Sequence, residues 1–350
     1  MTKTNLLLVL TGVLSIPALA QDNVRLRKGD PLVGSVKSAD YAGLSFQPSK
    51  GAVQTIAWRD VVAIEYAGVT GLGKAITEIN SGSFKEAEAQ LEALKGDAKV
   101  KGPARQDVLY FSALCKQRQG QFDEALAGYR DYIKEFPKGR FLRAVGDGIL
   151  ACHAGKNDVA GAGKTLDELF NAVRTAGETA FQGDEAILKG IQLEEQKKYS
   201  DARFQYGLAE KAAGAAPAVS QEARLGIARC LQREGKGAEA DQYCRKLVAE
   251  DAPNFILAGA WNGIGEVLRD EGKKKRDSEK LLDALYAFLR GVVQYGPVPG
   301  EPTSEHMRAL QGSSECFRFL AELETNADRK KLFNERARER AEQLKREYGR

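Results

Sequence analysis

From about residue 72 onward, apolar residues recur at helical spacing and the pattern repeats along the chain. In each copy a small alanine lies early in a helix, and apolar or aromatic residues follow about four and seven positions later. This spacing places the apolar residues on one helical face. Another apolar helix precedes each copy, which predicts helix–turn–helix units of about 34 to 44 residues. We call the preceding helix the first helix of a unit and the helix with the alanine its second helix. Five stretches with their alanines show the pattern: 82–94 (Ala87), 120–137 (Ala125), 197–210 (Ala202), 235–250 (Ala240) and 280–297 (Ala284).

These units resemble tetratricopeptide (TPR) repeats, and the best copy is DVLYFSALCKQRQGQFDEALAGYRDYIKEFP at 107–137. The ending YIKEFPKGRF also looks like TPR proteins of bacterial envelopes. The resemblance implies a mainly α fold, with a TPR-type solenoid of about six to seven repeats over 75–350. Such units bury their apolar faces against their neighbours, so several are needed for stability. The TPR-like positions of the best copy are Ala113, Gly120, Phe122, Ala125 and Pro137.

Residues 24–66 follow a different pattern, of short apolar and aromatic runs separated by Gly, Pro, Asp and Ser. The runs VRLRKG, LVGSVKS, AGLSFQP, VQTIAW and VVAIEY predict five short strands and a small antiparallel barrel. The segment 21–67 resembles SH3-like or Sm-like barrels. We expect Trp58 to lie in the core or against the next domain, although a ligand-stacking role is the alternative. Six basic and five acidic residues nearly cancel here, which argues against nucleic-acid binding.

The first twenty residues, MTKTNLLLVLTGVLSIPALA, have the pattern of a secretory signal peptide. Lys3 gives the positive region, residues 6–16 are apolar, and Ala18 to Ala20 form an A-x-A-like cleavage site. We predict cleavage after Ala20 and a periplasmic or extracellular protein; an uncleaved anchor is the alternative. No later stretch reaches 18 apolar residues, so we expect no transmembrane span in the mature chain. Loss of Lys3 lowers the formal net charge from +4 to +3, which gives no case for nucleic acid or anionic membrane as partner.

Two glycine-lysine runs approach the pattern of a nucleotide-binding P-loop. The GAGKT run at 161–165 lies where a repeat should begin its second helix, so we expect helix packing there and an exposed Lys164. A P-loop also needs a preceding strand and a glycine where this chain has Asp158. The run GVTGLGKA at 68–75 has both glycines but carries Ala75 where Ser or Thr would hold Mg²⁺. We therefore interpret residues 68–74 as a Gly-rich linker and expect no nucleotide or other cofactor.

Cysteine and histidine supply little candidate chemistry. Three cysteines each lie ten residues before an alanine of a second helix, namely Ala125, Ala162 and Ala240. This shared position predicts a small apolar slot that thiols fill well. Cys230 and Cys244 are the one pair placed for a disulfide within a unit. The two histidines, His153 and His306, lie in no catalytic or metal-binding motif, so we expect no metal site and no enzyme activity. The basic run KKKR at 273–276 is interpreted as a solvated loop, with contact to an acidic partner as the alternative. The three register cysteines are Cys115, Cys152 and Cys230.

The leading functional hypothesis is a non-enzymatic protein-interaction scaffold of the cell envelope. The TPR resemblance implies that a partner protein or peptide binds in the concave groove, which first helices line. A Tyr and two Arg suit such a site, because these residue types are enriched at interface hot spots. A self-assembling structural subunit and an accessory regulator of an envelope enzyme are the alternatives. Carried over by position, the groove residues are Tyr110, Leu114, Gln117, Leu225, Arg229 and Arg233.

Overall fold

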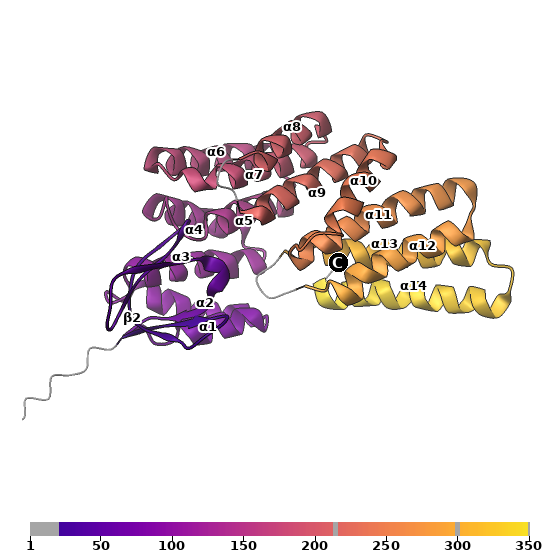
Figure 1. Ribbon diagram of the computed structural model, residues 1–350. Helices are drawn as coiled ribbons and strands as arrows, with labels where there is room; N and C mark the ends of the chain where they lie inside the picture. The colour runs from indigo at the N-terminus through magenta and orange to yellow at the C-terminus, as the bar shows by residue number, and fades with distance from the viewer. Residues whose placement is uncertain (1–20, 213–215, 298–301, 349–350) are drawn as a thin grey trace, which may run out of the picture.

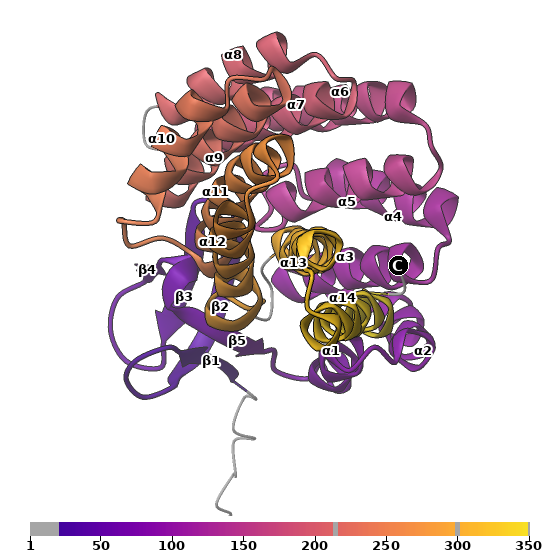
Figure 2. The ribbon, with the colours of Figure 1, turned by 90° about the vertical axis from the view of Figure 1, so that its right-hand side faces the viewer.

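The computed structural model describes residues 21–212, 216–297 and 302–348. The predicted signal peptide, residues 1–20, lies outside the described residues. Figure 1 shows a small N-terminal sheet followed by helical pairs that stack side by side along a curved path. Figure 2 shows the pairs curving round, with the sheet near one edge of the curve. The predicted mainly α fold with an N-terminal antiparallel β domain is confirmed.

The N-terminal sheet is antiparallel, with strand order β4-β3-β2-β1-β5. It is not closed into a barrel, so the barrel prediction is wrong. The reason lies in its two edge strands, because β4 is only three residues long and the 3₁₀ turn η1 (Trp58–Asp60) separates it from β5. Val24, Leu44 and Phe46 form its small core. The strands are β1 (Asp22–Leu26), β2 (Leu32–Asp40), β3 (Gly43–Pro48), β4 (Gln54–Ile56) and β5 (Val61–Glu65).

Fourteen α-helices in the described residues form seven consecutive pairs. The first of them begins at Leu72, inside the segment that the sequence assigned to the linker, after Gly71 at φ +97°. The helices are α1 (Leu72–Asn80), α2 (Phe84–Lys95), α3 (Gly102–Arg118), α4 (Phe122–Glu135), α5 (Leu142–Gly155), α6 (Val159–Ala176), α7 (Gln182–Glu195), α8 (Tyr199–Glu210), α9 (Pro217–Arg233), α10 (Gly237–Leu247), α11 (Asn254–Lys275), α12 (Ser278–Leu289), α13 (Ser304–Leu323) and α14 (Ala327–Tyr348).

An aromatic side chain on a second helix fills the gap left by glycines on two successive first helices. Tyr206 of α8 packs between Gly190 of α7 and Gly226 of α9. A Cβ atom at Gly190 or Gly226 would lie 2.5 or 2.6 Å from the Tyr206 ring, closer than real Cβ contacts allow. Phe288 of α12 lies in the same way against Gly312 of α13. Close packing between units therefore depends on glycine at these positions.

The GAGKT run begins helix α6, as predicted. The Asp158 carboxylate caps this helix by accepting a 2.9 Å hydrogen bond from the Gly161 amide. A Cβ atom at Gly163 would meet only the end of the flexible Gln192 side chain of α7, so this glycine lies where the next unit approaches. Lys164 is exposed. The glycines and lysine of this run are thus accounted for by the start of a packed helix that follows another helix.

The basic run at 273–276 is not a loop, which corrects the interpretation above. Lys273, Lys274 and Lys275 form the last turn of α11, and Arg276 ends the helix in the left-handed region at φ +53°. Cations are favoured at a helix C-terminus, where the backbone carbonyls carry partial negative charge. Lys273 also lies 4.0 Å above the ring of Phe319 on α13.

All five cysteines are free and buried, so the structure forms no bridge between Cys230 and Cys244. Cys230 lies among the apolar residues around Tyr206, whereas Cys244 packs in the separate cluster around Ile256 and against Gly263. Burial raises the pKa of each thiol to about 12. These cysteines serve packing, as the repeated spacing predicted.

Candidate partner-binding surface

The hairpin of β2 and β3 fastens the sheet to the beginning of the solenoid. The carbonyl oxygen of Ala39 accepts hydrogen bonds from the Arg140 amide at 3.2 Å and from Gln106 Nε2 at 3.0 Å. The Tyr41 amide donates to the Lys138 carbonyl oxygen at 2.6 Å. The end of β2 thereby pairs with the segment between α4 and α5, as one strand pairs with another.

Arg140 is the main link between sheet and helices. Its guanidinium group donates to Asp107 of α3 at 2.5 Å and lies 5.0 Å from the ring centroid of Trp58. The Trp58 indole donates to the Asp40 carbonyl oxygen at 2.8 Å, and Tyr66 Oη donates to Asp107 at 3.1 Å. Trp58 therefore packs against the next domain, as predicted. The sheet is held to the solenoid by buried polar contacts, not by the linker alone.

The three groove residues predicted on α3 have defined intramolecular contacts. The Tyr110 ring stacks on Phe141, with centroids 4.1 Å apart and planes 10° apart. Burial, with the charge of Asp147, raises the pKa of Tyr110 to about 12. Gln117 accepts a 2.5 Å hydrogen bond from the Tyr129 hydroxyl. Leu114 is half-buried. Partner binding at these three positions stays a prediction.

The first helices α5, α7 and α9 bring an arginine and three carboxylates together beside Tyr110. Arg143 binds Glu222 through two hydrogen bonds of 2.7 and 3.0 Å, Asp184 at 2.6 Å and Asp147 at 3.1 Å. Asp184 also accepts a hydrogen bond from the Tyr41 hydroxyl at the tip of the hairpin. We call Arg143, Asp147, Asp184 and Glu222 the N-terminal ionic cluster. Sequence reasoning missed it; the available signal was a charged residue near the start of three successive first helices.

One carboxyl in this cluster has an unusual acidity. Burial raises the pKa of Asp147 from 3.8 to about 6. The Arg143 guanidinium opposes this rise, and the carboxylates of Glu222 and Asp184 add to it. A single arginine thus faces three carboxyl groups, and Asp147 lies in a site where its charged form is disfavoured.

The three groove residues predicted on α9 have different surroundings. Leu225 is 1% exposed and packs among apolar residues of α10 and α11, so it does not face an open groove. The cause is close approach of the next unit, because Gly259 of α11 leaves room for the Leu225 side chain. Arg229 is half-buried and binds Glu194 of α7 through bonds of 3.1 and 2.8 Å. Arg233 is exposed and forms no ion pair with the residues that the structure describes.

Arg229 belongs to a second group of charges on α7, α9, α11 and α13. Its Nη1 atom lies 3.6 Å from Oε1 of Glu305, and Arg308 binds Glu305 at 2.8 Å and Glu266 at 2.7 Å. Although burial raises the pKa of Glu194, Arg229 holds it below its usual value. We call Glu194, Arg229, Glu266, Glu305 and Arg308 the C-terminal ionic cluster.

Beside the C-terminal ionic cluster lies a polar cavity of about 260 Å³. It spans three successive first helices and includes the unpaired Arg233. Arg269, which pairs with Glu315 at 2.8 Å, adds a second guanidinium group to the wall. Arg233 therefore adds an exposed positive charge to the lining of a cavity built from several units. The lining residues are Arg233, Glu266, Arg269, Arg308, Gln311, Gly312 and Glu315.

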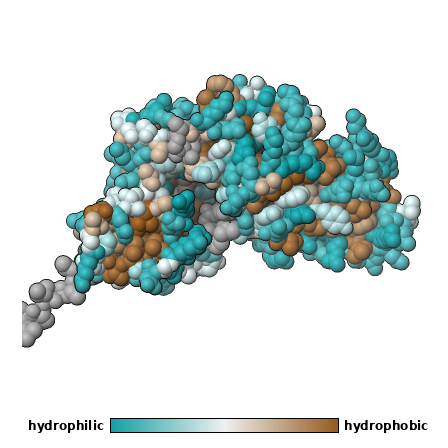
Figure 3. Space-filling view, viewed as in Figure 1, coloured by the Kyte–Doolittle hydropathy of each residue, from teal (hydrophilic) through white to brown (hydrophobic). Residues whose placement is uncertain are grey.

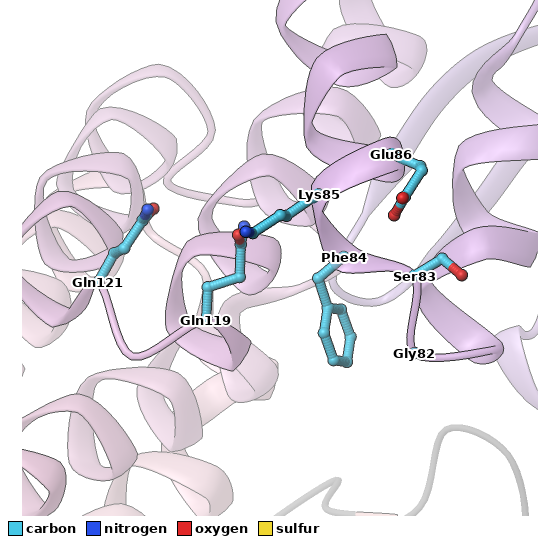
Figure 4. Close-up of a pocket in the computed structure, with 7 residues that line it drawn as sticks. All are labelled: Gly82, Ser83, Phe84, Lys85, Glu86, Gln119 and Gln121. Carbon is cyan, nitrogen blue, oxygen red and sulfur yellow. The ribbon is translucent and has the colours of Figure 1, made fainter.

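A second, more open hollow of about 470 Å³ lies at the turns of the first two helical pairs. Figure 4 shows Phe84 and Lys85 at the start of α2, with Gln119 and Gln121 at the turn that follows α3. This hollow is lined by residues from the turns of two helical pairs, whereas the cavity beside Arg233 is lined by residues from the first helices of three units.

His153, Asp158 and Thr165 form a hydrogen-bonded chain that resembles a catalytic triad in connectivity. His153 Nδ1 lies 3.0 Å from Asp158 and Nε2 lies 3.1 Å from the Thr165 hydroxyl. Thr165 is 2% exposed, and Arg130 of α4 already donates to its oxygen at 3.2 Å. These contacts join α4, α5 and α6, so we assign the chain a packing role.

In the described part of the chain, no group of three or more His, Cys, Asp and Glu is arranged to hold a metal ion. Among the described helices, none is long and apolar enough to cross a membrane.

Comparison with known families matches residues 107–139 to the tetratricopeptide repeat. Among solved structures, a tetratricopeptide repeat protein from Parabacteroides merdae is similar at 16% identity and TM-score 0.43, covering 76% of this chain and 97% of that one. The apo form of the quorum sensor NprR from B. thuringiensis is similar at 13% identity and TM-score 0.45, covering 77% and 85%.

A complex of the TPR2AB domain of yeast Sti1 with pHSP90 is similar at 17% identity and TM-score 0.26, covering 68% and 96%. Comparison with curated proteins finds no match. The repeat match coincides with α3, α4 and the turn after them, the copy that the sequence pattern predicted best. This chain therefore carries a tetratricopeptide repeat within a solenoid of seven described helical pairs.

Proposed function

We propose that this protein is a non-enzymatic interaction scaffold that binds a partner protein or peptide on the surface formed by its first helices. The observation that carries the proposal is the cavity beside the C-terminal ionic cluster. Three successive units contribute to it, and Arg233 lines it without an ion-pair partner in the described residues. Arginine is enriched at interface hot spots because its planar group forms several directed hydrogen bonds.

The proposal includes export to the cell envelope. Its support is the N-terminal sequence, with Lys3, an apolar stretch at 6–16 and the A-x-A-like end at Ala20.

A capture experiment tests the proposal. The chain from residue 21 onward is cross-linked in envelope extract of the source organism, beside Arg233→Glu and a matched control, Lys164→Glu. Both positions are exposed on α-helices, and Lys164 lies on α6, a second helix. We expect a discrete partner with the wild type and the control, and loss of that partner with Arg233→Glu. Equal capture by all three chains would contradict the proposed surface.

One observation favours self-assembly as a second function. Val33, Val53 and Val62 of the N-terminal domain are 48%, 54% and 50% exposed, and Figure 3 shows apolar residues gathered over this region. In the described residues, each edge strand pairs on one side only. Val62 lies on the edge strand β5, and an open edge with an exposed apolar residue favours pairing with another chain. A mass that rises with protein concentration would support a structural subunit.

A further inference from the structure

The two ionic clusters join helices that a solenoid ordinarily keeps apart. In repeat proteins each unit contacts only its immediate neighbours. Here Arg143 of α5 binds Glu222 of α9, across the intervening unit that begins with α7. Arg229 of α9 likewise lies 3.6 Å from Glu305 of α13, across the unit that begins with α11. Both bridges therefore connect units two apart, and both depend on α9.

These bridges lie in a poorly solvated region, so bulk salt screens them little. The side chains of Arg143 and Glu222 are 19% and 15% exposed, and Glu305 is 7% exposed. The first bridge is bidentate, with two bonds of 3.0 Å or less, which fixes orientation as well as distance. A change in the curvature of the solenoid would move α5 away from α9 and break that geometry.

Each bridge can be removed without leaving its arginine unpaired. Without Glu222, Arg143 still binds Asp147 and Asp184. Without Glu305, Arg229 still binds Glu194, and Arg308 still binds Glu266. The carboxylates of Glu222 and Glu305 are therefore dispensable for neutralising buried arginine charge. Glu305 also accepts a 3.0 Å hydrogen bond from Asn262 of α11, and the contact across two units is what the two carboxylates have in common.

We propose that these two bridges are an ionic latch that holds the solenoid in a tightly curved, closed form, and that releasing them lets its ends move apart. Neighbouring units are joined by apolar packing and by ion pairs such as Arg229–Glu194, whereas a bridge across two units constrains their summed rotation. The latch would control how open the surface formed by the first helices is. Because it acts within one chain, it can be measured without a partner, and its failure would leave the proposed function standing.

Distances between spin labels test the latch. Labels are attached to Glu124→Cys on α4 and Asp283→Cys on α12, two exposed positions. The native thiols are buried and resist labelling, and the chain without introduced cysteines measures any background. Distance distributions are compared for this chain with and without Glu222→Ala and Glu305→Ala together. The control is Glu250→Ala, which breaks an ion pair with Arg224 inside one unit.

We expect a longer and broader distance distribution in the double variant, with a shift larger than that between Glu250→Ala and the parent chain. Circular dichroism and thermal melting confirm that each variant is folded. If the double variant does not fold, Glu222→Gln with Glu305→Gln replaces it, compared with Glu250→Gln, under the same expectation. An unchanged distribution in a folded variant, or an equal shift in the control, would overturn the latch.

Discussion

Replacement of Asp147 by Asn should stabilise the protein at pH 8 and leave its stability nearly unchanged near pH 4. The folded-state pKa of Asp147 is about 6 and its ordinary value is 3.8. The folded protein therefore binds a proton more readily than the unfolded chain between these two values. By linkage, Asp147 costs stability progressively as the pH rises through this window, and the cost is complete above it.

The magnitude follows from the same pKa values. One pKa unit corresponds to about 1.4 kcal/mol, so the full difference amounts to about 3 kcal/mol. The Asp147 side chain is 40% exposed, and solvent screening reduces this figure to about 1 kcal/mol. Asn resembles the protonated carboxyl and removes the repulsion from Glu222 and Asp184.

Urea unfolding of wild type and variant at pH 8 and pH 4.5 is the assay. The difference between the two chains isolates Asp147, because every other titrating group is common to both. The reasoning predicts a gain of about 1 kcal/mol at pH 8 that shrinks at pH 4.5. A loss of stability at pH 8 would refute it, since attraction to Arg143 would then outweigh burial and repulsion.

Three further predictions concern packing and burial. Gly226→Ala should destabilise the protein by about 1–3 kcal/mol, because its Cβ would lie 2.6 Å from the Tyr206 ring. Gly207→Ala should instead stabilise α8 by about 1 kcal/mol, because nothing lies within 4 Å of the added Cβ atom. Thermal melting measures both variants, and a higher melting temperature for Gly226→Ala than for Gly207→Ala would contradict this packing. The five buried thiols should react with a thiol reagent only after denaturation, since burial raises their pKa to about 12; rapid labelling of the native protein would show otherwise.

The helical pairs were predictable from the sequence because their signal is local. Ala125 and Ala240 are fully or almost fully buried, and the cysteines ten residues earlier lie buried on the first helices as the spacing indicated. The same register placed the GAGKT run at the start of a helix. Small residues at a fixed offset are required wherever two helices approach closely, so the pattern recurs in each copy.

The ionic clusters were not predictable in the same way. Arg143 meets Asp184 41 residues along the chain and Glu222 79 residues along it. Whether such side chains meet depends on the summed rotation of several units, which no local pattern fixes. Leu225 shows the same limit, because its burial follows from how closely α11 approaches α9. The prediction of a closed barrel was wrong for a related reason. The residues of β4 and β5 have a strand pattern locally, but the two strands do not pair with each other.

Site-specific photo-cross-linking tests the central claim most directly. A photoreactive amino acid replaces Gln311, which lines the cavity beside Arg233, and in a second chain it replaces Lys164 on α6. Both chains are irradiated in envelope extract and their adducts are identified by mass spectrometry. The proposed scaffold function predicts a discrete adduct at position 311 that position 164 does not give. Adducts at position 164 alone, or the same adducts at both positions, would contradict partner binding on the first-helix surface.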